Sequence, residues 1–296
     1  HVTTPVHDVY AVRYAHHDRP SHENYIGGDP HDTNEPLAYF VWVIKGAGTT
    51  YVLDTGFDGA MAEKRGRTIT RPVAEGLRAI GVNPDTVTDV VISHLHYDHC
   101  GNHSLFPQAR YHLQDREMMY ATGRYMCHGH QRIPFEADDV VAMVRRVFDE
   151  RVVFHNGAEQ LAPGLTVHHV GGHSMGLQCL RVATRRGHVV LAADATHLYS
   201  HIEQGRVFPV CYSVAETLEG YATIKRLADS PGHIVPGHDP DVLKRYPAAA
   251  PREFTQGRIN WFARDVDWAD KLGFRGREDI ESPDGQWTRQ ELICVG

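Results

Sequence analysis

Two kinds of hydrophobic pattern alternate along most of the chain. Short apolar runs rich in β-branched residues predict strands, and apolar residues three or four positions apart predict helices. In LAYFVWVIKGAGTTYVLD (37–54), two such runs flank a polar stretch, which predicts a hairpin. Further strands are predicted over 89–93, 109–114, 151–155, 165–170, 177–184, 188–194 and 233–239. Helices are predicted over 70–82, 115–122, 137–148 and 213–229.

This order mixes strands and helices within one unit. We expect an α/β fold in which two packed sheets are covered by helices on their outer faces, a four-layer αββα sandwich. The main domain is expected to span 1–246, with a long polar loop at 14–36. The extension at 247–296 begins with PAAAP, which is typical of a linker. An aromatic, weakly helical segment follows at 261–274, and the last residues are expected to be irregular.

Composition narrows the functional classes. The 296 residues carry a formal net charge of −7 and have no Lys/Arg block, which disfavours nucleic acid and an anionic membrane as partners. No apolar stretch approaches the roughly 20 residues of a membrane span, and the N-terminus lacks the pattern of a signal peptide. Five cysteines without a CxxC pair favour a reducing compartment, so we expect a cytoplasmic protein.

Histidine is abundant, with 22 residues, and it concentrates after one predicted strand. HLHYDHCGN follows the apolar run DVVIS and places His94, His96, Asp98 and His99 within six positions. Residues two apart in an extended segment point to the same side, so His94 and His96 can face one point. Imidazole and carboxylate together suit zinc and related metals. The cluster therefore predicts a metal site rather than four solvated loop residues.

Three more potential ligands follow later strands. His173 lies in the loop GGHSMG, Asp194 ends LAAD, and His238 ends VPGHD. Loops at strand ends collect functional side chains on a rigid frame. A carboxylate can bridge two ions, so this set allows a site for two metals.

The motifs HLHYDH, GGHS, AADA and PGHD, in this order, resemble the metallo-β-lactamase superfamily and, within it, most closely the N-acyl-homoserine lactonase family. The resemblance covers roughly residues 8 to 246 and implies the αββα fold already expected. It also implies two metal ions. His94, His96 and His173 would hold the first ion, and Asp98, His99 and His238 would hold the second. Asp194 would bridge the two ions. Asp54 in DTG is expected to hydrogen-bond a ligand histidine and hold its tautomer.

Two metal ions can share a hydroxide that attacks a carbonyl carbon at neutral pH. Besides ligating, Asp98 is placed to relay a proton. The lactonases often have a tyrosine three positions after the bridging aspartate, and this chain has His197 there, with Tyr199 two residues on. His197 is expected to donate the same hydrogen bond or to shape a different pocket, and Tyr199 is a further candidate catalytic residue. The alternatives are that His197 is merely exposed and that Tyr199 packs in the core.

The resemblance thus predicts a dinuclear hydrolase that opens a lactone, with N-acyl-homoserine lactones as the leading substrates. Zinc is the default metal, while iron, cobalt and manganese suit the same ligands. The alternative is a hydrolase of other esters, thioesters or phosphotriesters on the same scaffold. A di-iron redox protein and a non-catalytic or nucleic-acid-processing relative are further alternatives. We also expect a homodimer in which the loop at 14–36 walls the pocket.

Overall fold

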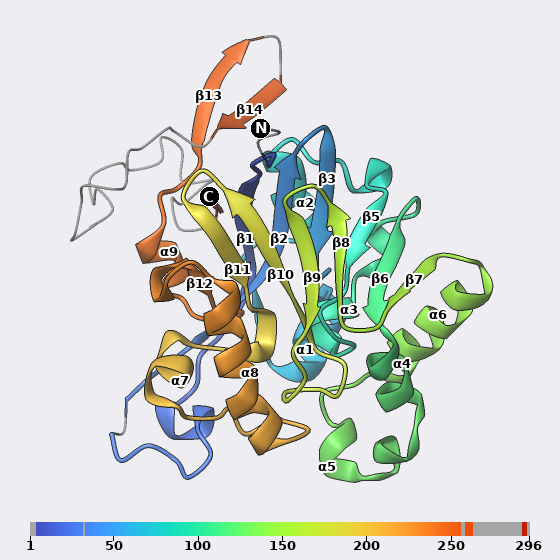
Figure 1. Cartoon of the computed structure of the whole chain (residues 1–296), viewed down its shortest axis with the longest axis vertical. Helices are drawn as coiled ribbons and strands as arrows, with labels where there is room; N and C mark the ends of the chain where they lie inside the picture. Colours follow the sequence, from blue (N-terminus) through green and yellow to red (C-terminus); the bar gives the residue numbers. More distant parts are fainter. Residues whose placement is uncertain (1–3, 32, 256–257, 263–291, 295–296) are drawn as a thin grey trace.

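A computed structural model describes residues 4–31, 33–255, 258–262 and 292–294. Its larger sheet has the strand order β15-β1-β2-β3-β5-β6-β7, with β4 paired to β1 (Figure 1). The central part is mixed, because β1, β2 and β3 pair antiparallel whereas β3, β5, β6 and β7 pair parallel. The bounds of its strands are Asp8–His17 (β1), Leu37–Gly46 (β2), Thr49–Leu53 (β3), Thr68–Ile69 (β4), Asp89–Val91 (β5), Arg110–Gln114 (β6), Val152–His155 (β7) and Leu292–Cys294 (β15).

The smaller sheet has the order β12-β11-β10-β9-β8. Its strands pair antiparallel except for the parallel pair of β11 and β12. The bounds are Ala158–Ala162 (β8), Leu165–His169 (β9), Gln178–Thr184 (β10), Gly187–Leu191 (β11) and Ile234–Val235 (β12). A separate hairpin joins β13 (Ala250–Thr255) and β14 (Arg258–Phe262).

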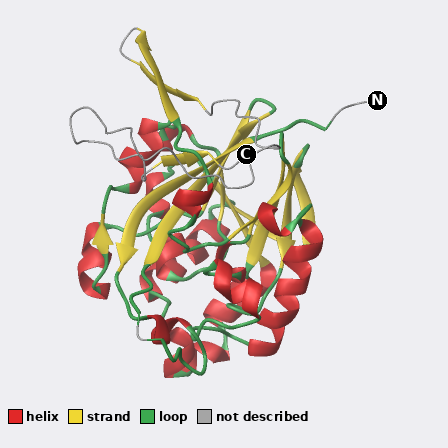
Figure 2. Cartoon of the chain, turned by 90° about the vertical axis from the view of Figure 1, so that its left-hand side faces the viewer, coloured by secondary structure: helices red, strands yellow, loops and turns green. Residues whose placement is uncertain are grey.

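The α-helices lie on the outer sides of the two sheets and at one end of them (Figure 2). Helix α2 packs on β1, α4 on β6 and α6 on β7, whereas α8 packs on β11 of the other sheet. Of the described helices, none is long and apolar enough to cross a membrane. Their bounds are Gly59–Arg65 (α1), Val73–Ala79 (α2), Tyr97–Cys100 (α3), Asp115–Thr122 (α4), Gly129–Arg132 (α5), Ala137–Phe148 (α6), Tyr199–Gln204 (α7), Val214–Leu227 (α8) and Val242–Arg245 (α9).

Three buried clusters separate the four layers, and the alternation of side chains along β2 shows why. Val41 and Val43 point to the cluster beneath the helices of the larger sheet, which also contains Leu77 and Met143. Trp42, on the opposite face, packs in the cluster between the two sheets. A third cluster joins the smaller sheet to α8. The αββα sandwich expected from the sequence is therefore confirmed.

The carboxyl ends of several strands from both sheets meet at one end of the sandwich. Strands β3 and β5 run parallel in the larger sheet, and β11 and β12 run parallel in the smaller one. The loops that follow these strands therefore leave the sandwich at the same end, the lower end in Figure 1. This end carries the residues predicted to bind metal.

Two expectations need correction. Residues 14–17 belong to β1, because backbone pairing with β2 continues to His17, so the N-terminal loop begins at Asp18 and includes a one-turn helix at Ser21–Asn24. At the other end, residues 250–251 of the expected linker begin strand β13, and residues 261–262 of the expected helical segment end strand β14. The remainder of the predicted helical segment, 263–274, lies outside the described residues.

Candidate metal centre

The first four predicted ligands lie on a tight turn between β5 and α3. Strand β5 ends at Val91, and the chain turns so that His96 immediately precedes α3. Helix α3 then presents Asp98 and His99 on its first turn. All three histidines of the motif are buried, whereas the Asp98 side chain keeps 11% of its surface exposed. Asp98 is thus the member of this motif most open to the outside.

The three later ligands come from the smaller sheet. His173 lies in the loop between β9 and β10, Asp194 lies just beyond β11, and His238 lies just beyond β12. Each of them is at most 4% exposed. Because β11 and β12 are parallel neighbours, Asp194 and His238 emerge at the same edge.

The seven side chains form two groups around Asp194. On one side, His96 Nδ1 lies 2.9 Å from His94 Nε2 and 3.0 Å from His173 Nε2, while Asp194 Oδ2 lies 3.2 Å from His173 Nε2. These three histidines form one group able to hold a metal ion. Asp194 Oδ2 is the oxygen that lies on the side of this group.

On the other side, Asp194 Oδ1 lies 3.0 Å from His238 Nε2 and 3.3 Å from His99 Nε2. Asp98 Oδ2 lies 3.6 Å from the same nitrogen of His238 and 3.5 Å from that of His99. Asp98, His99 and His238 form a second group able to hold a metal ion. The two oxygens of Asp194 thus face two different ligand groups.

The hydrogen bonds of His173 and His238 show which ring nitrogen of each is available to a metal ion. His173 Nδ1 lies 2.7 Å from the Val210 carbonyl, and His238 Nδ1 lies 2.9 Å from the Ala38 carbonyl. A carbonyl only accepts, so each Nδ1 donates, and the Nε2 of the neutral ring turns its lone pair inward. The result is a group of lone pairs that face one another.

Two buried inward atoms have no hydrogen-bond partner among the described residues, His99 Nε2 and Asp194 Oδ1. Converging lone pairs and buried carboxylates repel one another unless cations lie between them. The donor set therefore fits two divalent ions with nitrogen and oxygen ligands.

Burial and charge act in opposite directions on the titration of these groups. Burial lowers the pKa of His94 and of His96 well below its usual value, which keeps both rings neutral and able to bind metal. Burial by itself raises the pKa of the Asp194 carboxyl, but the surrounding histidines lower it well below the usual range. The Asp194 carboxylate, which lies between the two ligand groups, is therefore ionised.

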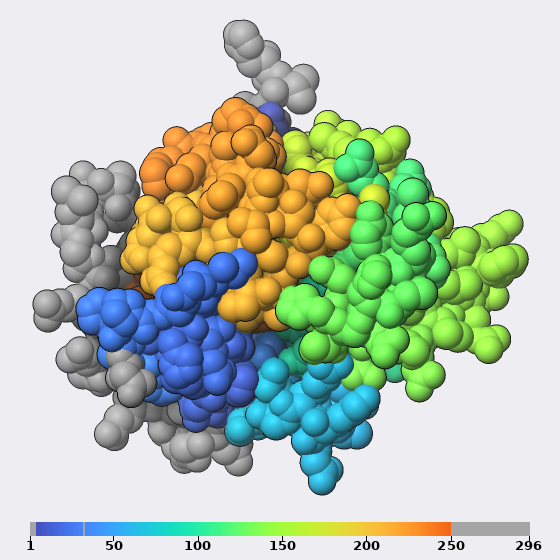
Figure 3. Space-filling view, turned by 90° about the horizontal axis from the view of Figure 1, so that it is seen from below, coloured from blue at the N-terminus to red at the C-terminus, as the bar shows by residue number. Residues whose placement is uncertain are grey.

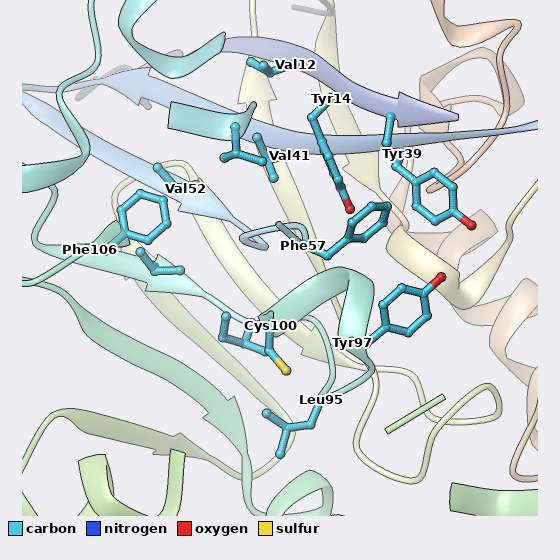
Figure 4. Close-up of a cluster of buried hydrophobic side chains, with 14 of the residues drawn as sticks. Val12, Tyr14, Tyr39, Val41, Val52, Phe57, Leu95, Tyr97, Cys100 and Phe106 are labelled. Atoms are coloured by element: carbon cyan, nitrogen blue, oxygen red, sulfur yellow. The ribbon is translucent and has the colours of Figure 1, made fainter. Parts of the chain in front are cut away.

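Asp54 has the expected contact with a ligand histidine. It follows β3, and its Oδ2 lies 2.7 Å from His99 Nδ1. Its other oxygen accepts a hydrogen bond of 2.7 Å from the Ser93 backbone N–H. Asp54 therefore fixes both the tautomer of His99 and the turn that carries the histidine motif. Cys100 is fully buried in the hydrophobic cluster beside Leu95, as Figure 4 shows, and so packs in the core.

Glu117 on α4 is a further residue at the centre, and the sequence patterns did not indicate it. Its fully buried carboxylate accepts hydrogen bonds from the Leu95 N–H at 2.8 Å, the Ser174 hydroxyl at 2.7 Å and the Gly176 N–H at 2.9 Å. A Cβ at Gly176 would lie 2.1 Å from the Glu117 nitrogen, so only glycine allows this approach. Glu117 thus joins the loop of His94 and His96 to the loop of His173.

His197 lies in the centre, as expected, but its neighbour is Asp194. Its Nε2 lies 3.0 Å from Asp194 Oδ2, and its ring stacks on Phe208 with centroids 3.9 Å apart. Together with His173 and Asp194 it forms another group of potential ligands. The side chain is 4% exposed, so the alternative of an exposed His197 does not apply.

Tyr199 lies elsewhere. It packs in the cluster between the sheets with Tyr246, and the Arg245 guanidinium carbon lies 3.4 Å from the centroid of its ring. No described contact joins Tyr199 to the ligand groups, so the structure gives it a packing role in place of the expected catalytic one.

The surface over this end of the sandwich is built by segments far apart in the sequence. Figure 3 shows the N-terminal loop in blue, α1 in cyan, the region of α4 and α5 in green and α8 in orange, arranged around a hollow. Phe135, between α5 and α6, contacts His96 edge to face at 4.6 Å between centroids. An aromatic wall therefore borders the ligand groups.

The chain is similar in sequence to known proteins of one activity. The chain is 29% identical over 182 residues to the N-acyl homoserine lactonase AttM of Azorhizobium caulinodans, a match that covers 58% of this chain and 66% of the relative. It is 32% identical over 126 residues to the N-acyl homoserine lactonase AiiB of Agrobacterium fabrum, covering 42% of this chain and 45% of that protein. The chain thus matches less than two thirds of either relative's length.

Solved structures show the same fold. One is an N-acyl homoserine lactone hydrolase with the product N-hexanoyl-L-homoserine at its catalytic metal centre, with a TM-score of 0.66, 19% identity and coverage of 80% of this chain and 94% of that one. Another is AidC, a dizinc quorum-quenching lactonase, with a TM-score of 0.62, 15% identity and coverage of 90% and 97%. The sequence pattern of the metallo-beta-lactamase superfamily matches residues 34–252, which is most of the described fold, and the chain therefore belongs to this superfamily.

Proposed function

We propose that this protein hydrolyses the ester bond of lactones, with N-acyl-homoserine lactones as the first substrates to test. The observation that carries the proposal is the division of Asp194, whose two oxygens face two separate ligand groups. Such a division suits a centre of two metal ions rather than one. The similarity to lactonases among the curated relatives supports a lactone as the substrate.

His94, His96 and His173 would hold one ion, Asp98, His99 and His238 the other, and Asp194 both. When bound, two divalent ions supply a hydrolytic nucleophile from water at neutral pH and polarise the ester carbonyl. Zinc is the proposed metal, because the ligands are imidazoles and carboxylates. Iron, cobalt or manganese are the alternatives that the same ligands accept.

The protein's own groups complete the site. Asp98 is the partly exposed ligand, so its carboxylate is placed to take a proton from a group that enters from the hollow. His197 holds the Oδ2 side of Asp194 and, through its stack on Phe208, forms part of the wall. Ring opening yields a hydroxy acid, and the leaving alkoxide takes up a proton.

Turnover measurements on purified protein of known metal content test this proposal. We expect kcat/KM for acyl-homoserine lactones to exceed that for aryl esters, thioesters and organophosphates, and to vanish after chelation. The lactonase proposal fails if no lactone is turned over faster than a simple aryl ester. Preferred turnover of thioesters or phosphotriesters would favour the alternative hydrolase on the same scaffold.

We also propose a homodimer in which the N-terminal loop walls the site. Within one chain this loop already contacts the site's outer wall, because the Asn24 carbonyl lies 2.8 Å from His201 Nε2 and Ile26 N–H donates to the Val207 carbonyl at 2.8 Å. Removal of residues 18–32 is expected to change both the mass in solution and KM. If both stay unchanged, this assignment of the loop is wrong.

A further inference from the structure

A group of basic side chains lies where β1 ends and β4 begins. Strand β4 pairs antiparallel with the end of β1, with His16 opposite Thr68. His17, the last residue of β1, and Arg67, the residue before β4, are therefore neighbours. Arg67 Nη1 lies 3.3 Å from His17 Nε2. Arg19 follows two residues after His17. We refer to Arg19, Arg67 and His17 as the basic group.

The basic group is poorly neutralised. Arg67 has no carboxylate partner among the described residues. It contacts the Tyr97 hydroxyl at 3.1 Å, the Arg65 carbonyl at 2.5 Å and His17, and it also hydrogen-bonds the Tyr39 side chain. The nearby Arg65 differs, since its guanidinium lies 2.5 Å from a Glu136 carboxylate oxygen. In a chain of net charge −7, a guanidinium without an acidic partner is unusual and needs a reason.

Two nitrogens of the basic group are buried without a hydrogen-bond partner, Arg19 Nε and His17 Nδ1. Burial and the charges of the two arginines lower the pKa of His17 to about 4, so its ring is neutral at pH 7. Because Arg67 donates to His17 Nε2, the ring proton lies on Nδ1, which is therefore a donor without an acceptor. The carboxylate nearest to Arg19 is that of Glu23, at 3.6 Å, and its side chain is 48% exposed.

This group lies one side chain away from the metal ligands. The residue that Arg67 contacts, Tyr97, stands between two ligands in the sequence, and the Tyr39 ring contacts the His238 ring at 5.0 Å between centroids. Figure 4 shows the hydroxyls of Tyr39 and Tyr97 on the same side of the aromatic cluster. On the other wall, the guanidinium carbon of Arg19 lies 5.3 Å from the centroid of Phe208, whose ring stacks on His197.

We propose that Arg19, Arg67 and His17 form a subsite for a carboxylate on the substrate, at the end remote from the ester that the metal centre opens. Guanidinium groups bind carboxylates through short, charge-assisted hydrogen bonds, and buried donors without partners gain most from such a ligand. The subsite selects lactones that carry an anionic side chain over neutral ones of the same shape. This inference rests on the proposed lactonase function, which it makes more specific.

A pair of matched substrates tests the subsite. One is an acyl-homoserine lactone whose chain ends in a carboxylate, the adipoyl compound, and the other is its neutral isostere ending in an isopropyl group. We expect wild-type protein to have the higher kcat/KM for the charged lactone, and Arg67→Gln or Arg19→Gln to lower the charged-to-neutral ratio by about tenfold or more. Arg67→Lys is expected to retain part of the preference, and added salt to reduce it.

The matched control is Arg110→Gln, which removes an exposed arginine that pairs with Asp89 at 3.1 Å on β5. It is expected to leave the charged-to-neutral ratio unchanged. Thermal unfolding of every variant shows whether it folds. The subsite is refuted if wild-type protein prefers the neutral lactone, or if the preference for the charged one survives in folded Arg67→Gln and Arg19→Gln.

Failure of the lactonase proposal gives a different result, because neither lactone is then turned over. Calorimetric titration of the metal-loaded protein with adipate then tests the subsite directly. Any contact of adipate with the metal ions is common to all variants. Weaker binding to Arg67→Gln and Arg19→Gln than to Arg110→Gln supports the subsite, and equal affinity of all three variants overturns it.

Discussion

Glu117→Gln separates the metal ligands from the residue that holds their loops in place. The glutamine keeps the size of the side chain but has only one accepting oxygen. If that oxygen takes over the two bonds from the Ser174 hydroxyl and the Gly176 N–H, the new NH₂ faces the Leu95 N–H, donor against donor. The loop that carries His94 and His96 then loses its tie to α4.

The expected cost follows from this count. One lost hydrogen bond to a charged group is worth about 1.5–3 kcal/mol, and a buried N–H left unpaired costs about 1–3 kcal/mol. Part of this cost is offset, because burial raises the pKa of the Glu117 carboxyl and so makes its charge expensive in the folded state. We expect a net loss of about 2 kcal/mol in the free energy of unfolding, and metal affinity lower by roughly tenfold to a hundredfold.

Urea unfolding and competition with a chromophoric chelator measure the two quantities. The control is Glu136→Gln, which removes a carboxylate bound to Lys64 and Arg65 near the surface. It is expected to cost at most about 1 kcal/mol and to leave metal affinity unchanged. If Glu117→Gln matches the control in both measurements, Glu117 does not position the ligand loops.

Three other predictions concern the centre and its surroundings. In Asp54→Asn the one remaining oxygen can accept from the Ser93 N–H, which leaves an NH₂ donor against His99 Nδ1. Metal binding is expected to weaken about tenfold to a hundredfold by chelator competition, whereas unchanged affinity would contradict the orienting role of Asp54. His197→Phe keeps the stack on Phe208 but not the contact with Asp194, so we expect kcat to fall while thermal stability holds; a wild-type kcat would exclude His197 from the reaction. Burial and nearby carboxylates raise the pKa of Asp139 to about 6. Its ionisation therefore lowers the free energy of unfolding increasingly from about pH 4 to pH 6, and by the full amount above pH 6. In urea unfolding, Asp139→Asn should stabilise the protein by about 1–2 kcal/mol at pH 7 but not at pH 4.

The sequence alone indicated the fold and the candidate metal ligands. The hairpin at 37–54, the helices at 73–79 and 214–227 and the αββα layering follow from periodic apolar positions, which are local signals. The histidine motif and the three later ligands stand out because each follows a strand, and parallel strands bring their ends to one edge. The division into two groups around Asp194 is what the resemblance to the lactonases implies, and the distances that separate the two groups come from the structure.

Tertiary structure decided the remainder. Glu117 lies 22 residues from Leu95 and 57 from Ser174 in the sequence, so no spacing rule connects them. His197 and Tyr199 are two residues apart, yet one faces Asp194 and the other packs in the core, because α7 begins between them. The basic group depends on the pairing of β4 with β1, which places Arg67 beside His17 across 50 residues of sequence. Such contacts depend on how distant segments pack, and the local pattern of the chain contains no trace of them.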